Sequence, residues 1–140
     1  MSTYQTIEVN CRQGYRVKDL VSSEAIMPGH VVEPVAAGTV RKNTIVTAGL
    51  TSRTVALHDK YTGGTVATSW ASGSRVQYGQ FLPGDEVQLV LKSGEVATVQ
   101  GTLRVDNAGR VVVAGTDAPY ARALEAKTAS GDELIWACLL

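Results

Sequence analysis

The stretch His58-Asp59-Lys60 places an acid, a base and an amine next to one another in this chain of 140 residues. An imidazole beside a carboxylate is a pair that general acid–base catalysis uses, and an amine could act as a nucleophile. The spacing argues against that chemistry, because adjacent residues of a strand point to opposite faces. The residues that follow, Tyr61-Thr62-Gly63-Gly64, are typical of a loop. We therefore expect no catalytic site here.

Other residues with catalytic potential lack partners in the sequence. His30 follows a turn glycine and has no second histidine near it, which argues against a metal site. Ser22-Ser23 and Ser130 lack the Gly-x-Ser-x-Gly context of a nucleophile, and no glycine-rich loop has the Gly-Lys-Ser/Thr ending that holds phosphates. Acidic residues are not arranged as an acid and base pair. The sequence predicts a binding or structural protein, not an enzyme, with no cofactor and no metal.

Composition narrows the range of partners. Lys and Arg number 13, Asp and Glu also number 13, and the formal net charge is +0. Because no positive field attracts a phosphate backbone, we expect no direct contact with nucleic acid. The first ten residues lack a basic segment followed by an apolar run, and no window approaches the roughly 18 to 20 apolar residues of a spanning helix. We expect a soluble protein that is not exported by this route and makes no membrane contact.

Two cysteines, Cys11 and Cys138, stand near opposite ends of the chain and belong to no Cys-x-x-Cys or Cys/His cluster. Cys138 lies within the apolar run 134–140, where the simplest interpretation is a small buried hydrophobic residue. A disulfide would require the two Cα atoms to approach within about 7 Å. Whether the two cysteines pair is not decided by the sequence.

The elements available to position any site are strands. Val87, Leu89 and Leu91 alternate with Gln88 and Lys92, which predicts a half-buried strand followed by a turn at 92–95 into a strand at 96–99. The segments 101–105 and 110–114 flank Asp-Asn-Ala-Gly, which predicts a hairpin. Segments 38–42 and 54–58 predict two more strands, and 119–126 fits a helix or a strand, of which we favour the strand. Short strands separated by glycine turns predict an all-β fold, a small β-barrel or sandwich.

Four strands begin after a similar turn. Gly29, Gly73, Gly84 and Gly131 are each followed closely by Val or Leu, and two of them are preceded by proline. Proline restricts its own φ and glycine supplies the reversed backbone angle, so this pattern turns the chain and begins a strand. We expect four corners, with Val31, Val76, Val87 and Leu134 as the first residues that point inward.

The first 22 residues differ from the rest. Their apolar residues are spaced as in a strand but are interrupted by 10–14, which predicts an extended N-terminal arm over 1–22 and a β-barrel body over 23–140. We expect the arm to contribute little to the stability of the body and to contact a partner. Trp136 lies in the final apolar run and is expected to be buried, whereas Trp70 is expected on a loop, against a neighbour or over the barrel mouth. The expected partner contacts are therefore Tyr4, Ile7, Val9, Tyr15, Val17 and Trp70.

The order of these segments resembles that of the head decoration, or cement, proteins of tailed bacteriophages. The resemblance covers most of 25–140, although each motif alone is only a turn and the start of a strand. Where such proteins often have Gly-Asp before an Arg-Val strand, this chain has Gly73-Ser74. The segments that show it are Ala25–Glu33, Gly38–Lys42, Val55–Asp59, Ala71–Gln77, Leu82–Val87 and Ala121–Ala126.

The resemblance implies a structural virion protein made in the host cytoplasm. Its expected position is the outer surface of the capsid, where it would bind the major capsid protein and stabilise the head. It also implies a homo-oligomer, most often a trimer and in some phages a dimer. Two alternatives remain open from the residues alone: another virion part, such as a tail or head-completion protein, and a small β-barrel ligand-binding domain or enzyme.

Overall fold

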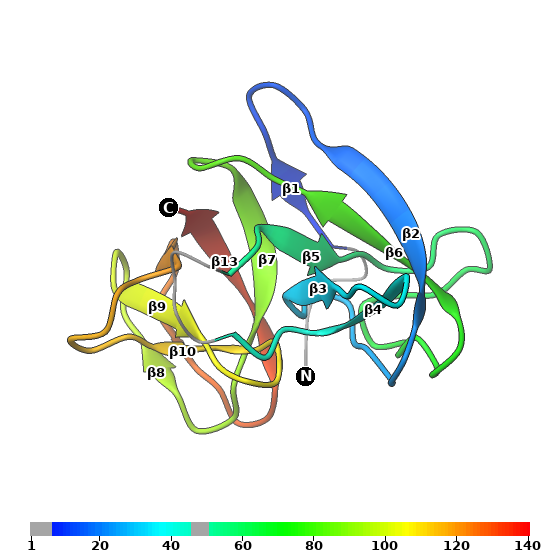
Figure 1. The fold of residues 1–140 in the computed structure, drawn as a ribbon. Coiled ribbons are helices and arrows are strands. Elements are labelled where there is room, and N and C mark those ends of the chain that lie inside the picture. The colour runs from blue at the N-terminus through cyan, green and yellow to red at the C-terminus, as the bar shows by residue number, and fades with distance from the viewer. Residues whose placement is uncertain (1–6, 46–50) are drawn as a thin grey trace.

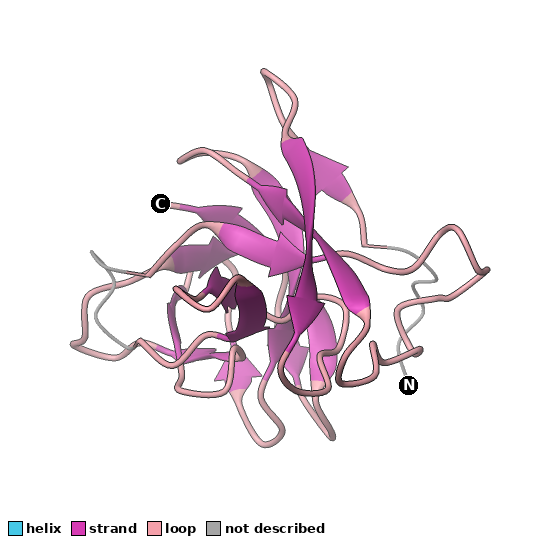
Figure 2. Cartoon of the chain, turned by 45° about the vertical axis from the view of Figure 1, so that its right-hand side comes forward, coloured by secondary structure: helices cyan, strands magenta, loops and turns pink. Residues whose placement is uncertain are grey.

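The computed structural model describes residues 7–45 and 51–140, and these form strands connected by turns and loops with no helix among them (Figures 1 and 2). The all-β prediction is therefore confirmed. Within the same ranges, no helix is long and apolar enough to cross a membrane.

Five strands close into a barrel. In ring order they are β7, β10, β9, β11 and β13, and β13 pairs back onto β7. The short strand β1 pairs antiparallel with the start of β7, and β8 and β12 form a separate two-stranded sheet. Barrel closure buries an apolar interior that includes Leu89, Leu103 and Ile135. The bounds are β1 Val9–Asn10, β7 Glu86–Leu91, β8 Val96–Ala97, β9 Thr102–Val105, β10 Val111–Val113, β11 Ala121–Ala123, β12 Lys127–Thr128 and β13 Glu133–Leu139.

The other five strands form a second sheet with a core of its own. Its outer strands, β3 and β5, approach each other through a bridge between Val31 and Val55, and the N–H of Ala56 donates to the carbonyl oxygen of His30 at 2.9 Å. The sheet therefore curls toward a second barrel around a cluster that includes Ile26, Trp70, Val76 and Tyr78. In spatial order the strands are β3 Val32–Pro34, β4 Thr39–Lys42, β2 Arg16–Ser22, β6 Arg75–Gln80 and β5 Thr54–Ala56.

Backbone hydrogen bonds join the two sheets. The N–H of Val31 donates to Gly109 at 2.8 Å, and the N–H of Gly109 donates to Asn43 at 3.1 Å. Within the second sheet, the N–H of Asn43 donates to Val31 at 2.9 Å. A further bond runs from Val90 to the carbonyl of Gly29 at 3.1 Å. Because these groups are buried, their mutual pairing replaces the water that they lose on folding. The two units are thus one hydrogen-bonded body.

The four predicted corners each precede a strand. Val31, Val76 and Val87 are completely buried, as expected for the first inward residues. Leu134 is also buried, at 4% exposed, but it lies on the opposite face of β13 from Ile135, next to Gly29. Gly29, Gly73 and Gly84 have φ of 92°, 88° and 92°, values that favour glycine.

The fourth corner is formed differently. Gly131 is not among the glycines with positive φ, so the predicted reversed angle is wrong there. Side chains hold this turn instead: the hydroxyl of Ser130 donates to Glu133 at 2.9 Å, and Asp132 accepts from the N–H of Ser93 at 2.9 Å. A glycine next to polar turn residues therefore does not by itself indicate a left-handed angle.

The predicted hairpin over 101–114 is confirmed, since β9 and β10 pair antiparallel. Segment 119–126 contains strand β11, as favoured over a helix. The strand expected after the turn at 92–95 is reduced to β8, which pairs with β12 and not with β7. The strand β7 is buried on both faces, not half-buried: Gln88 is completely buried, and its Oε1 accepts from the N–H of Glu8 at 2.9 Å.

The predicted boundary between arm and body at residue 22 requires correction. Strand β2 pairs with β6 over Arg16–Val21 and with β4 at Val21–Ser22, and β1 pairs with β7. From residue 7 onward the segment is therefore paired within the body, which argues against the expectation that these residues add little stability. The polar interruption at 10–14 is the connection between two strands that join different sheets. Tyr4 lies outside the described residues.

The two tryptophans lie on the predicted kinds of element but differ from their expected burial. Trp70 does lie outside the named strands, but it is buried in the second core, and its Nε1–H donates to the carbonyl oxygen of Leu57 at 2.7 Å. Trp136 is only half-buried, because it lies opposite Gln88 on the outer face of β13 while Ile135 and Ala137 point inward. Strand alternation within the last apolar run therefore decides which residues are buried.

Candidate interaction surface

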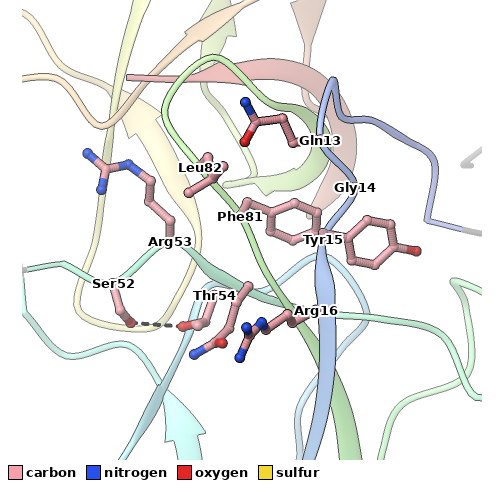
Figure 3. A pocket seen from close by; sticks show the side chains of 10 residues that line it. Gln13, Gly14, Tyr15, Arg16, Ser52, Arg53, Thr54, Phe81 and Leu82 are labelled. Atoms are coloured by element: carbon pink, nitrogen blue, oxygen red, sulfur yellow. Dashed lines mark hydrogen bonds between the residues drawn. The ribbon is translucent and has the colours of Figure 1, made fainter.

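A groove lies at the end of the second sheet, beside the loop between β1 and β2, and has a volume of about 740 Å³ (Figure 3). Three chain segments that are far apart in the sequence form it. Their residues are Gln13, Gly14, Tyr15 and Arg16 from the β1–β2 connection and the start of β2, Ser52, Arg53 and Thr54 at the start of β5, and Gln80, Phe81 and Leu82 at the end of β6.

Strand register explains the polar floor of the groove. Arg16 and Thr54 both lie opposite Gln80, on the two sides of β6, so these three side chains share one face of the sheet. One layer below, Tyr78 lies on the same face and is buried in the second core. The groove is therefore the polar end of the space that the second sheet encloses.

Aromatic and aliphatic side chains form the other side. The rings of Tyr15 and Phe81 stack with centroids 5.0 Å apart, and an added Cβ at Gly79 would lie 2.7 Å from the Phe81 ring. The absence of a side chain at Gly79 therefore leaves room for the Phe81 ring. Leu82 is 50% exposed at the rim. A ligand in this groove would meet both charged groups and apolar surface.

A second hollow, of about 690 Å³, lies along the face of β2 and β6 and includes Val17 and Tyr61. These side chains are 49% and 76% exposed. Together with the groove, this gives one side of the second sheet several exposed apolar residues, as expected for a surface that contacts another protein.

The expected contact residues divide into two groups. Tyr15 and Val17 are exposed, as a partner contact requires. Ile7 is buried in the barrel core, Val9 packs against that core, and Trp70 is buried in the second core. Ile7 and Trp70 therefore stabilise the fold, and their burial argues against their predicted role as partner contacts. Sequence reasoning missed Leu82 and Arg53, although Leu82 next to a Pro-Gly turn was a signal of an exposed apolar residue.

The side chains of His58, Asp59 and Lys60 have partners outside this triplet. The Nδ1 of His58 accepts from the N–H of Ile7 at 3.3 Å, and Asp59 accepts from loop residues that include Tyr61. Lys60 lies over the ring of Tyr61 at 5.6 Å. Burial, followed by the charge of Lys60, lowers the pKa of His58. The three groups thus stabilise a loop and do not form an acid–base pair.

His30 is buried, and its Nδ1 accepts a hydrogen bond from the N–H of Met27 at 3.1 Å. Burial lowers its pKa to about 4, and the positive charge of Lys42 acts in the same direction. Within 7–45 and 51–140 there is no group of three His, Cys, Asp or Glu side chains that could hold a metal ion. His30 is accordingly a neutral turn residue at pH 7.

The two cysteines are unpaired. Strands β1 and β13 both pair with β7 near Glu86. Cys138 lies directly opposite Glu86, whereas Cys11 follows the end of β1. Burial raises the pKa of Cys11 to about 11, with the carboxylate of Asp85 as the next cause.

Comparisons of the sequence with family models and with curated proteins give no match. The fold, however, is similar to a solved structure described as the head fiber gp8.5 N base in bacteriophage phi29. The TM-score is 0.59 at 11% sequence identity, and the alignment covers 91% of this chain and 95% of that chain. At this identity the similarity shows a shared fold, which extends over nearly the whole of both chains.

Proposed function

We propose that this protein is a structural component of a bacteriophage head and, more specifically, a decoration protein that binds the outer surface of the major capsid protein lattice. The observation on which this rests is the shared fold with a phage head fiber base over 91% of the chain. The order of turn and strand motifs, which resembles phage decoration proteins, supports the same assignment from an independent source. The isolated environments of the two histidines agree with a role without catalysis.

A small body of this kind would stabilise a head by spanning seams between capsid subunits. Each additional contact adds interface area, and after the first contact the others form at high effective concentration. The formal net charge of +0 suits such a role, because a strongly basic protein would also bind nucleic acid.

The contact surface that we propose is the exposed side of the second sheet. It replaces the extended arm that the sequence predicted, since the described part of that segment is paired within the body. Of the partner contacts predicted from the sequence, we retain Tyr15 and Val17, which are exposed, and we add the exposed Leu82. We also propose that the protein assembles with itself, as a trimer or alternatively as a dimer, which light scattering on the purified protein would distinguish by mass.

The test is occupancy on purified filled heads of the phage that encodes the chain. A decoration protein should be present on the order of hundreds of copies, in a fixed ratio to the major capsid protein, as symmetric assemblies require. Quantitative mass spectrometry gives the ratio, and cryo-electron microscopy gives the position. A handful of copies would instead support a tail or head-completion protein, and absence from the particle would contradict a virion role.

A pair of variants tests the proposed surface. Val17→Asp places a charge on the exposed face of β2, and it should lower occupancy on heads that lack the native protein. Val99→Asp is the matched control, because Val99 is similarly exposed, at 58%, but lies after β8 beside the closed barrel. Equal occupancy of both variants would exclude the β2 face as the contact surface.

A further inference from the structure

The groove of Figure 3 has a distinctive charge distribution. Two arginines, Arg16 and Arg53, line it, and no Asp or Glu does. Among the described residues, Arg16 has no carboxylate within ion-pair distance. By contrast, Arg41 and Arg75 each lie 2.7 Å from a carboxylate oxygen. An exposed guanidinium without an ion pair, in a groove that a second arginine also lines and that no Asp or Glu lines, is complementary to a carboxylate.

Hydrogen bonds already formed decide which groups can face a ligand. The hydroxyl of Thr54 donates to the carbonyl oxygen of Val32, and the hydroxyl of Ser52 lies 2.8 Å from that of Thr54 (Figure 3). The Ser52 hydroxyl also lies 3.2 Å from the carbonyl oxygen of Val32, so the protons of both hydroxyls are used within the protein. The N–H donors that line the groove are therefore the guanidinium groups of Arg16 and Arg53 and the side-chain amides of Gln13 and Gln80. Arg53 uses its Nε–H to bind a main-chain oxygen of Leu140 at 2.8 Å, which holds the side chain in place.

The apolar side of the groove indicates that the ligand also carries apolar side chains. The stacked pair Tyr15 and Phe81 and the half-exposed Leu82 offer a surface to an apolar side chain next to the carboxylate. A volume of about 740 Å³ is small enough to hold only a few residues of an extended chain. The formal net charge of +0 disfavours a long phosphate backbone as the ligand.

We propose that this groove binds an extended acidic segment of a partner protein, in which Asp or Glu alternates with apolar residues. The carboxylates contact Arg16 and Arg53, and the apolar side chains lie against Tyr15 and Leu82. The inference deepens the proposed function and rests on it in one respect, namely that the partner supplying the segment is a capsid subunit. The binding chemistry itself can be tested without a capsid.

The experiment is a titration of the isotope-labelled protein, followed by two-dimensional amide NMR. The probe is a synthetic decapeptide of alternating Glu and Leu, and the control peptide replaces every Glu with Gln. The acidic peptide should shift the amide signals of 13–16, 52–54 and 80–82, and the Gln peptide should leave them in place. A decamer of oligothymidylate, titrated separately, should not shift them. Shifts of these signals by oligothymidylate at the same concentrations, or by both peptides equally, would overturn the proposal.

Charge variants locate the binding. Arg16→Gln should lower the affinity for the acidic peptide at least about threefold, as expected for the loss of a partly screened ion pair. Arg75→Gln removes the same charge from an exposed site at the other end of β6 and should leave the affinity unchanged. Arg53→Gln should also weaken binding, provided that its amide spectrum retains the native dispersion. Equal affinity for the Arg16→Gln and Arg75→Gln proteins would contradict the groove as the site.

Occupancy on heads separates the two proposals. If the peptide binds the groove but the intact protein is absent from heads, the groove chemistry stands and the capsid as its source is wrong. If the intact protein decorates heads but the acidic peptide does not bind, the proposed function stands and the groove proposal fails.

Discussion

The carbonyl oxygen of Gly109 accepts the N–H of Val31 at 2.8 Å, and the space around Gly109 leaves no room for a Cβ, which would lie 2.5 Å from the Val31 carbonyl oxygen. This contact joins the β9–β10 hairpin of the closed barrel to the residue that precedes β3 of the second sheet. It is a backbone contact, so neither side can move without breaking the hydrogen bonds at the junction.

Gly109→Ala should therefore destabilise the protein strongly. Its φ of 73° costs a non-glycine residue about 1 to 2 kcal/mol, and the backbone clash should add at least about 2 kcal/mol. Gly73→Ala is the matched control, since Gly73 has φ of 88° with nothing within 4 Å of the added Cβ. Urea denaturation measures both. Similar losses in the two variants would show that the junction with Val31 relaxes at little cost.

Trp70→Ala should lower the free energy of unfolding by about 3 to 5 kcal/mol, because the indole is buried in the second core. Trp136→Ala should cost less, about 1 to 2 kcal/mol, since Trp136 is only partly buried. Trp70→Phe keeps most of the volume but leaves the Leu57 carbonyl without its 2.7 Å donor, and should cost about 1 to 3 kcal/mol. Chemical denaturation of the three variants tests the order, and a larger loss for Trp136→Ala than for Trp70→Ala would contradict it.

His30 should make stability depend on pH between about 6.5 and 4. Its pKa in the folded protein is lowered to about 4 from an ordinary value of 6.5, so in this window the unfolded chain binds the additional proton. Stability is fully present above pH 6.5 and decreases as the pH falls toward 4, by about 3 kcal/mol in total. Nearby Lys42 and Arg110 contribute to the lowered pKa, and Asp132 and Asp106 oppose it.

His30→Gln isolates this contribution, because glutamine can accept the Met27 N–H but does not titrate. Melting temperatures of the unsubstituted protein and of His30→Gln should diverge from pH 7 to pH 4, and the unsubstituted protein should lose more stability. Parallel curves would show that His30 does not cause the loss.

Cys11 should react slowly with iodoacetamide at pH 8. Burial and the Asp85 carboxylate raise the pKa of its thiol from 9.0 to about 11, which reduces the reactive thiolate by on the order of 100-fold. The rate, measured in a Cys138→Ser background, should rise through pH 10 to 11. Asp85→Asn removes the nearby charge and should increase the rate at pH 8. Modification at the rate of an ordinary exposed thiol would contradict the raised pKa.

The strands of this protein are predictable because their signals are local. Alternating residues such as Val87, Leu89 and Leu91, and the glycine turns before β3, β6 and β7, act through neighbouring φ angles and the two-residue side-chain period. These features are sufficient to determine an all-β fold and the positions of most strand starts. The polar turn 106–109 determines its hairpin for the same reason.

The pairing of distant strands was decided by the tertiary structure alone. The period of two places Ile135 and Trp136 on opposite faces, but it does not determine which face is buried; the pairing of β13 with β7 decides that. The same holds for β2, whose exposed, interrupted sequence resembles an arm until it pairs with β6. The candidate groove combines segments 13–16, 52–54 and 80–82, and no local signal relates them. Contacts over such separations depend on how the whole chain buries its apolar area, which is a property of the assembled sheets and not of any single segment.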